Sequence, residues 1–300
     1  MRKAETNPKG VPRNVSILSL VNAACTRLIE SGIRPEEAGL DAEVLARHLL
    51  GWDRATYFTE RHRKVTRGFD KEYIALIARR ARREPVAYLT GRREFWGLEF
   101  AVTPDTLIPR PETELLVETV LHLRPDRSIN GVLVDVGTGS GCIAVVLALE
   151  FPNMTIVATD ISQPALAVAQ ANAKRHGVSE RIEWRHGPQL AGLSGPIDLI
   201  VSNPPYVTAQ AMQHLTPEVR DHEPHVALNG GTGGTRTLRA LIAEASVKLV
   251  RNGSLVVEFG YDQEAVFRQV VNAAHLTDTQ VVHDIQGLPR VGVAEYRTNR

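Results

Sequence analysis

The chain has 300 residues, of which 43% are hydrophobic and 23% charged, and its formal net charge at pH 7 is +1. This length predicts one large domain or two smaller ones with a sizeable buried core. The balanced charge argues against a global field that attracts nucleic acid, and no apolar stretch is long enough to span a bilayer. Cys25 and Cys142 lie far apart and lack metal-ligand spacing. We therefore expect no metal, no membrane and a cytoplasmic location.

The first part of the chain is helical in pattern. Residues 1–14 are charged and polar without a following apolar run of the signal-peptide kind, so we expect a disordered tail. Apolar residues then recur at three- and four-residue spacing over 15–90. Pro35 and the acids after it open one helix, and Gly51 closes it. The pattern predicts a small N-terminal helical bundle.

The second part of the chain alternates strands and helices. Residues 91–114 are rich in aromatics and prolines, which indicates a connecting segment and not a flexible linker. Beyond it, in a domain over 115–300, short apolar runs alternate with helical stretches, which is typical of a parallel sheet covered on both faces. The expected strands are 132–136, 155–159, 199–201, 254–258 and 279–282. The fold class is therefore α/β, with a Rossmann-like sheet.

A glycine-rich turn, DVGTGSGCIA at 135–144, follows the first of these strands. Glycines allow positive φ and close approach of a ligand to the backbone. The spacing is neither the dinucleotide GxGxxG nor a Walker loop, because the third glycine comes one residue early and no GK[ST] follows. The turn suits a nucleoside without a pyrophosphate, and Asp160 at the end of the next strand can accept bonds from both hydroxyls of a ribose.

These features resemble the class I S-adenosylmethionine-dependent methyltransferases. The resemblance implies S-adenosyl-L-methionine as cofactor and S-adenosyl-L-homocysteine as product. Asp135 or its neighbours in the turn would face the methionine end, Asp160 would hold the ribose, and Asn203 would help to close the pocket. The cofactor-binding residues expected on this basis are Gly137, Thr138, Gly139, Ser140, Gly141, Asp160 and Asn203.

The strand expected at 199–201 runs into SNPPYV, residues 202–207. Neither proline can donate to a sheet ladder, and Asn203 before a proline is pushed toward extended geometry. The result is a stiff corner with free carbonyls at the carboxyl end of a strand, where ligands bind in α/β sheets.

In this setting NPPY resembles the motif of methyltransferases that act on adenine N6, cytosine N4 or a glutamine amide. Such a nitrogen is a poor nucleophile because its lone pair is delocalised. The Asn203 side-chain oxygen can accept one N–H, the Pro204 carbonyl can accept the other, and Tyr206 can pack on the planar group. Near-attack positioning can contribute ~7–11 kcal/mol to such a transfer. A strong general base is not required, because the nitrogen becomes acidic as it is alkylated. We assign catalysis to Asn203, Pro204 and Tyr206, and substrate binding to these residues together with Pro205.

A more specific resemblance covers nearly the whole chain. The stretch EPVAYLTGRREFWGLEF…LIPRPETE at 84–114, followed by DVGTGSGCIA, SNPPYV and EPHVALNGGTGG, is similar to the HemK/PrmC family. Those proteins are methyltransferases that act on N5 of the glutamine in the GGQ motif of peptide chain release factors. The resemblance implies that Phe100 and Tyr206 line the channel for the glutamine. It also implies that Arg110, Pro111 and Glu112 shape the pocket.

Two segments depart from the family pattern. Many members of the family carry an acidic residue near the adenine, after the third strand of their sheet. The corresponding segment here, Trp184–Arg185–His186–Gly187–Pro188–Gln189, has none, so the backbone of Gly187 is the remaining candidate for an adenine contact. The segment 230–234 is unusually rich in glycine, and we expect it to be mobile.

The resemblance assigns partner recognition to the helical domain. Its basic residues are interpreted mostly as solvated helix faces, with electrostatic steering of a partner as the functional alternative. They are Arg61, His62, Arg63, Lys64, Arg67, Arg79, Arg80, Arg82 and Arg83.

Other functions stay open at the level of the sequence. An amino-methyltransferase of DNA or RNA bases shares NPPY, but it must grip phosphate and extrude a base, and the near-zero net charge counts against nucleic acid as a direct substrate. A family member redirected to another protein or to a small molecule shares every motif. A binding module without activity is disfavoured by the intact NPPY.

Overall fold

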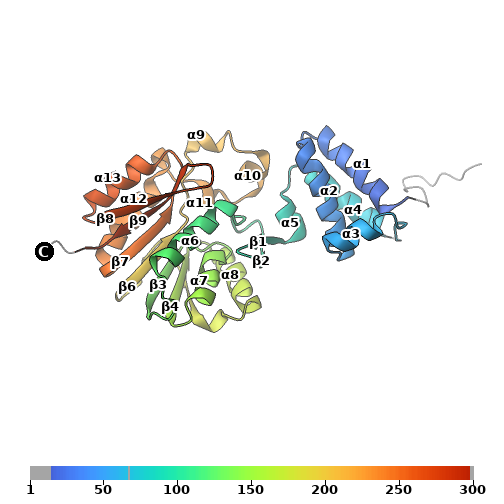
Figure 1. Cartoon of the computed structure of the whole chain (residues 1–300). Helices are drawn as coiled ribbons and strands as arrows, with labels where there is room; N and C mark the ends of the chain where they lie inside the picture. The colour runs from blue at the N-terminus through green and yellow to red at the C-terminus, as the bar shows by residue number, and fades with distance from the viewer. Residues whose placement is uncertain (1–14, 67, 298–300) are drawn as a thin grey trace, which may run out of the picture. The chain divides into compact units, whose positions relative to one another are not determined.

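The computed structural model of the chain describes residues 15–66 and 68–297, which form two compact units that divide between Thr90 and Gly91 (Figure 1). The tail expected at 1–14 and the basic residue Arg67 lie outside the described residues. Each unit has its own hydrophobic core.

The first unit is a helical bundle, as the periodicity predicts. Ser16 caps its first helix by accepting from the N–H of Ser19, and Gly51 ends the second with a φ of 65°. Tyr73 is buried at the centre, where its hydroxyl donates to the carbonyl of Ala42. The helices are α1 (Ile17–Glu30), α2 (Pro35–Leu50), α3 (Arg54–Glu60), α4 (Phe69–Arg80) and α5 (Val86–Thr90). The two short helices, α3 and α5, were not predicted.

Several basic residues of this unit form ion pairs, among them Arg63 with Glu60, Arg79 with Glu84 and Arg80 with Asp41. Arg80 is 5% exposed and its Nε donates to Asp41 at 2.7 Å. Arg79 donates to both carboxylate oxygens of Glu84. The expectation that Arg80 lies on a solvated, partner-facing surface is therefore wrong, because its charge is used inside the bundle.

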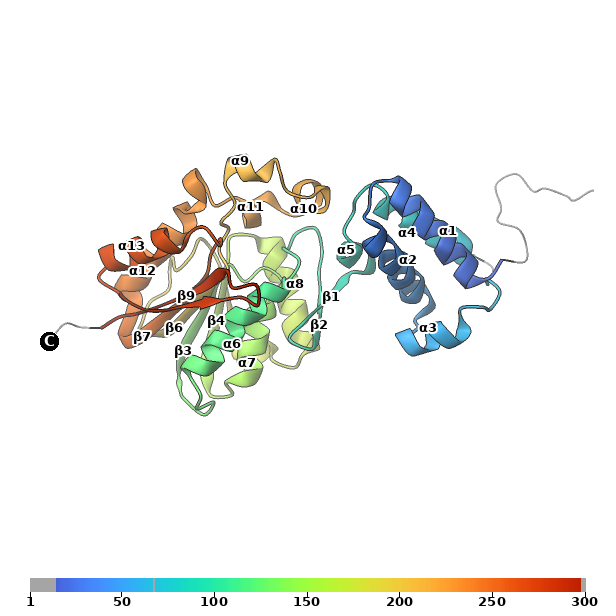
Figure 2. The same ribbon diagram turned by 45° about the horizontal axis from the view of Figure 1, so that its top comes forward.

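The second unit contains a sheet whose order, within the described residues, is β5-β4-β3-β6-β7-β9-β8 (Figures 1 and 2). The strands from β5 to β7 are parallel, whereas β9 is antiparallel to both of its neighbours. The strands are β3 (Gly131–Val136), β4 (Met154–Asp160), β5 (Ile182–His186), β6 (Ile197–Ser202), β7 (Leu249–Glu258), β8 (Thr277–His283) and β9 (Pro289–Glu295). The α/β prediction is confirmed, but the sheet is mixed and not fully parallel.

Helices cover both faces of this sheet (Figure 2). Successive strand residues alternate between the faces, so Leu133 packs in one core and Val134 in the other. The first core includes α6 and α7, and the second includes α12 and α13. The helices are α6 (Glu114–Leu123), α7 (Cys142–Glu150), α8 (Gln163–Arg175), α9 (Ala209–Met212), α10 (Pro217–His222), α11 (His225–Leu228), α12 (Arg236–Lys248) and α13 (Glu264–Ala273).

The segment 91–114 belongs to the second unit. It forms an antiparallel hairpin of β1 (Arg92–Phe95) and β2 (Leu98–Ala101), followed by a loop and the 3-10 turn η1 (Pro111–Thr113). The buried side chain of Asn172 in α8 holds the hairpin, because it accepts from the N–H of Ala101 and donates to its carbonyl. The aromatic residues of this segment therefore fill a core, which explains why it does not read as a flexible linker.

The strand order reverses at β3, which lies between β4 and β6. In open α/β sheets the crevice outside the carboxyl ends of the strands at such a reversal is the usual ligand site. Among the described residues, no helix has the length and apolar character to cross a membrane. The same part of the chain contains no group of three or more metal-ligating side chains.

Candidate active site

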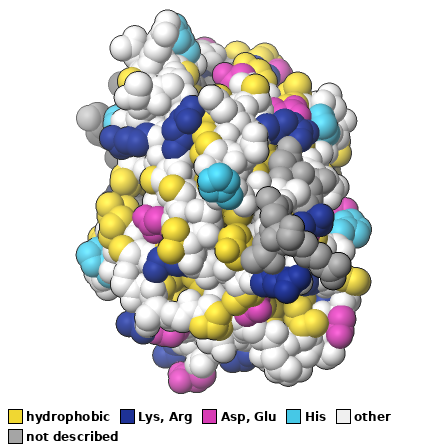
Figure 3. Space-filling model, turned by 90° about the vertical axis from the view of Figure 1, so that its left-hand side faces the viewer, with side chains coloured by type: hydrophobic (Ala, Val, Ile, Leu, Met, Phe, Trp, Pro, Cys, Tyr) yellow, Lys and Arg dark blue, Asp and Glu magenta, His cyan; other side chains and the backbone are white. Residues whose placement is uncertain are grey.

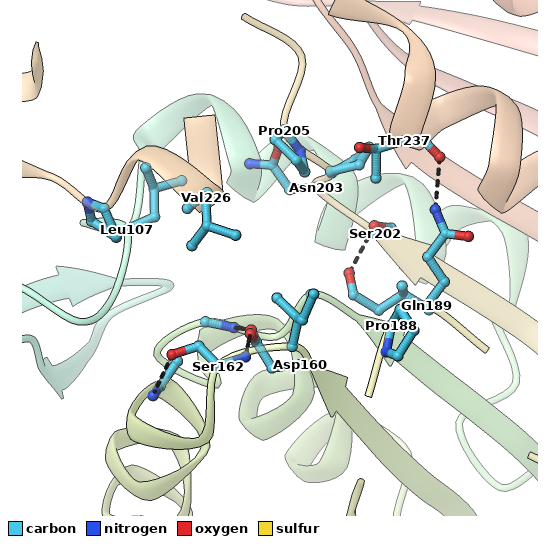
Figure 4. A pocket seen from close by; sticks show the side chains of 18 of the residues that line it. Leu107, Asp160, Ser162, Pro188, Gln189, Ser202, Asn203, Pro205, Val226 and Thr237 are labelled. Carbon is cyan, nitrogen blue, oxygen red and sulfur yellow. Dashed lines mark hydrogen bonds between the residues drawn. The ribbon is translucent and has the colours of Figure 1, made fainter. Parts of the chain in front are cut away.

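A cavity of about 490 Å³ lies at this reversal point, a size suited to a small-molecule ligand (Figure 4). The carboxyl ends of β3, β4 and β6 form its floor, and the loop before η1 and the segment around α11 contribute further walls. Ser202 donates its hydroxyl to the carbonyl of Val136 at 2.7 Å, which holds the ends of two strands together.

The glycine turn between β3 and α7 presents bare backbone to the cavity. Gly137 and Gly139 line it, both have positive φ, and a Cβ on either would meet no atom within 4 Å. Gly141 has another role, since a Cβ there would lie 2.9 Å from that of Ala169 in α8. Thr138 and Ser140 are buried and are not among the lining residues.

Asp135 holds the turn from beneath and does not face the cavity. Its Oδ2 accepts from the Thr138 hydroxyl at 2.6 Å and from the N–H of Ala144 at 3.1 Å. Burial raises the pKa of Asp135 to about 7. Of the residues expected to face a ligand here, Gly137 and Gly139 line the cavity and Asp135 does not.

Asp160 reaches the cavity from the end of β4, below Asn203 in Figure 4. Its two oxygens accept from the N–H groups of Gly139 and Ser162, each at 2.8 Å. Burial raises the pKa of this carboxyl, and these N–H bonds oppose the rise. Each oxygen keeps a second lone pair, so Asp160 can still accept from a ligand's hydroxyls.

The sequence did not point to Ile161, an apolar residue next to Asp160 that also lines the cavity. Ile161 is 56% exposed, which is unusual for a large aliphatic residue. Gly187 lines the same region, but its N–H donates to the backbone carbonyl of Asp160. A flat base could rest on Ile161, whereas Gly187 could offer only its carbonyl.

Asn203 and Pro204 bring two hydrogen-bond acceptors into the cavity from the end of β6. The Asn203 Nδ2 donates to the Thr113 hydroxyl at 2.9 Å, which turns its Oδ1 away from Thr113. Within the described residues, neither this oxygen nor the Pro204 carbonyl accepts a hydrogen bond. Two acceptors without donors match a group that carries two N–H bonds.

Tyr206 is half-buried and is not among the residues that line the cavity. Its hydroxyl donates to Glu258 at 3.4 Å, and burial raises its pKa. Glu258 also accepts from Thr113, so a chain of hydrogen bonds leads from Tyr206 back to Asn203. The structure thus places Tyr206 behind the corner that Asn203 and Pro204 form.

The glycine-rich segment at 230–234 supports the NPPY corner by close packing. A Cβ on Gly230 would lie 2.8 Å from the carbonyl oxygen of Pro205, and one on Gly234 would lie 2.3 Å from that of Tyr206. Gln263 joins the two segments, since its Nε2 donates to the carbonyls of Tyr206 and Gly234. The expectation that this segment is mobile does not account for these contacts, which require glycine.

Arg110 fixes the loop that walls one side of the cavity. It donates to the buried carboxylate of Glu223 at 2.5 Å, and Glu223 also accepts from the N–H of Ile108. Pro111 and Glu112 begin η1 beside it. The cavity wall itself is formed by Asp105, Thr106 and Leu107.

Phe100 does not reach the cavity. It is fully buried, and its ring packs 6.2 Å from that of Phe95 and 5.1 Å from that of His176. The expectation that Phe100 binds the substrate is therefore wrong in this structure. Leu107, Val226 and Arg236 line the cavity instead. Leu107 and Val226 lie in the stretches LIPRPETE and EPHVALNGGTGG, but no role was predicted for either of them from the sequence.

The chain matches two family descriptions that divide it as the fold does. Residues 19–91 match the PrmC N-terminal domain, and residues 111–221 match the methyltransferase small domain. A methyltransferase from Pyrococcus furiosus shares the fold with a TM-score of 0.51 at 17% identity, covering 74% of this chain and 99% of that one. Fold and site together define a class I methyltransferase.

Curated relatives narrow the class to one family. The release factor glutamine methyltransferase of Koribacter versatilis is 41% identical over 262 residues, which are 87% of this chain and 92% of the relative. That of Cereibacter sphaeroides is 41% identical over 271 residues, 90% of this chain and 95% of the relative. The chain belongs to the family of release factor glutamine methyltransferases, and the resemblance seen in the sequence is confirmed.

Proposed function

We propose that this protein transfers a methyl group from S-adenosyl-L-methionine to N5 of the glutamine in the GGQ motif of a peptide chain release factor. The observation that carries the proposal is the pair of unoccupied acceptors, Asn203 Oδ1 and the Pro204 carbonyl, beside the glycine turn. The relatives' shared name supplies the substrate.

The residues present fit the cofactor. Gly137 and Gly139 offer backbone that a ligand can approach closely, Asp160 offers acceptors for ribose hydroxyls, and Ile161 offers an apolar surface for the base. When bound, the cofactor supplies an electrophilic methyl group on a sulfonium. We assign the cofactor end of the cavity to these four residues.

Asn203 and Pro204 would act on the glutamine amide. Each accepts one N–H of the side-chain nitrogen, which directs its lone pair toward the methyl group. The new N–C bond forms as the S–C bond breaks, and the nitrogen then loses one proton. Pro205, which also lines the cavity, stiffens the corner, and Tyr206 supports it from behind. The proposed site of action is the cytoplasm, since release factors act in translation.

A nucleic-acid base is a weaker candidate substrate. Basic and acidic side chains are interspersed on the face of the molecule shown in Figure 3, as the net charge of +1 leads one to expect. A phosphate backbone is instead bound by clustered Lys and Arg.

The test is a methyl-transfer assay with labelled S-adenosyl-L-methionine and three acceptors. These are a release factor, the same factor with the glutamine of its GGQ motif changed to alanine, and duplex DNA. We expect label on the first acceptor alone. Label on the changed factor or on DNA would contradict the proposal.

A further inference from the structure

Three residues behind the cavity form a hydrogen-bond chain that the proposed reaction does not itself use. Thr113 Oγ1 donates to Glu258 Oε2 at 2.8 Å and accepts from Asn203 Nδ2 at 2.9 Å. Tyr206 donates to the other oxygen of Glu258 at 3.4 Å. Thr113 and Glu258 are 2% and 1% exposed, so water does not compete for these bonds.

The chemistry of the chain fixes its direction. An ionised carboxylate can only accept hydrogen bonds, so the single hydroxyl proton of Thr113 must be donated to Glu258. The Thr113 hydroxyl then offers Asn203 only lone pairs, so only the amide nitrogen of Asn203 can bond to it, as a donor. The Asn203 oxygen is left facing the cavity, where an acceptor is required.

We infer that Glu258, acting through Thr113, sets which end of the Asn203 amide faces the substrate. If Glu258 carries a proton, it can donate to Thr113, and Thr113 can then donate to the Asn203 oxygen. The amide would turn over and present its N–H groups to the N–H groups of the glutamine. Donor would then face donor, and the proposed alignment of the nitrogen would be lost.

The surroundings of Glu258 allow this change of state near neutral pH. Burial raises the pKa of Glu258 to about 7, while the Thr113 hydroxyl and the charge of Arg290 in β9 oppose the rise. Tyr206 also opposes it, and Glu112 in η1 adds to it. Arg290 is itself paired with Asp284 at 2.9 Å, which limits how far its charge lowers the pKa of Glu258. Thr113 and Glu258 are thus positioning residues, since neither lines the cavity.

The inference rests on the proposed function, and its first test is a pair of substitutions at Thr113. Thr113→Val keeps the shape but removes the hydroxyl, and we expect kcat to fall by about tenfold or more with little change in cofactor Kd. Thr113→Ser restores the hydroxyl and should restore most of kcat. Thr119→Val is a matched control, because Thr119 is also buried and its hydroxyl donates only to its own helix, at the carbonyl of Leu115.

The second test is the pH profile of kcat. In the wild type we expect kcat to fall as the pH drops through about 7, since protonation turns the chain of bonds around. Glu258→Gln cannot titrate, so this acid limb should disappear and kcat should be lower at pH 8. Asp135 titrates in the same range but contacts the glycine turn.

The outcomes separate the inference from the function beneath it. A wild type that leaves the release factor unlabelled removes the proposed function. A labelling wild type whose Thr113→Val variant matches Thr119→Val removes this inference alone. An acid limb that persists in Glu258→Gln belongs to another group, such as Asp135, and also overturns it.

Discussion

At the scale of single residues, the site separates binding of the cofactor from alignment of the nitrogen. Asp160 and the glycine turn lie at the end of β3 and β4, and Asn203 and Pro204 lie at the end of β6. Both groups line one cavity, and the hydrogen bonds of Asp160 and Asn203 lead to different partners. Substitutions at either end should therefore change different constants.

Asn203→Ala tests the alignment. The variant keeps the Pro204 carbonyl but loses the acceptor for the second N–H, so we expect kcat to fall by roughly 10²–10³-fold, the effect typical of one donor or acceptor at a reacting centre. The cofactor Kd should stay within about threefold, because Asp160 is unchanged. Turnover near that of the wild type would show that Asn203 does not hold the nitrogen.

Asp160→Ala tests the cofactor end. The carboxylate accepts from Gly139 and Ser162, so its loss removes ligand contacts and loosens the turn. We expect the cofactor Kd, measured by calorimetry, to rise by roughly 10–100-fold, since bonds to charged groups contribute ~1.5–3 kcal/mol each. An unchanged Kd would remove Asp160 from the cofactor site.

At the scale of elements, the glycines at 230–234 allow close packing against the NPPY corner, which the glycine content of the segment does not reveal. Their number suggested mobility, but two of them allow the backbone to pass against Pro205 and Tyr206. A sequence reveals how many glycines a segment has and not which backbone lies opposite. Only the folded chain distinguishes a close approach from a hinge.

Gly234→Ala and Gly233→Ala form a matched pair for this point. Both glycines have positive φ, but a Cβ on Gly233 meets only the Thr235 hydroxyl at 3.9 Å, whereas one on Gly234 lies 2.3 Å from the Tyr206 carbonyl. We expect Gly233→Ala to lower the free energy of unfolding by about 1–2 kcal/mol, the cost of the backbone conformation. Gly234→Ala should cost more and should also lower kcat, because it displaces the NPPY corner. Equal effects in denaturant melts and turnover would contradict this account.

The predictability of the elements follows from how local their signals are. Buried strands such as β3 and β4 were predicted because a continuous apolar run indicates a buried strand. The edge strand β5 is IEWRH and β9 contains Pro289 and Gly292, so neither has that pattern. The glycine turn and NPPY were found as contiguous motifs. Thr113 and Glu258 were missed because they meet Asn203 only after folding, from positions 90 and 55 residues away (203 − 113 and 258 − 203).

At the scale of the whole molecule, the described residues divide into two units. The residues that line the cavity at the reversal of the sheet belong to the unit that begins at Gly91. The helical unit matches the PrmC N-terminal domain over residues 19–91, and its recognition of the partner protein stays a prediction. Its exposed basic residues include Arg63 and Lys64, whereas Arg80 is buried.

Reversal of Arg63 and Lys64 to glutamate tests electrostatic steering by this unit. We expect kcat/KM for the release factor to fall by roughly 3–10-fold at low salt and to approach the wild-type value at high salt. Cofactor Kd should not change. Reversal of Arg251 and Arg297, two exposed residues of the other unit, makes the same change in net charge and serves as the control. Equal effects of both double reversals would assign the loss to net charge and not to the helical unit.

The central claim is that the methyl group is placed on one side-chain amide, and its position on the product tests this most directly. After reaction with the wild-type protein, the release factor is digested and the GGQ peptide is sequenced by fragmentation mass spectrometry. The account predicts one added methyl group, on the glutamine side-chain nitrogen, which forms roughly 10²–10³-fold more slowly with Asn203→Ala. A methyl group on another residue, or an unmodified peptide under conditions in which the cofactor binds, would contradict it.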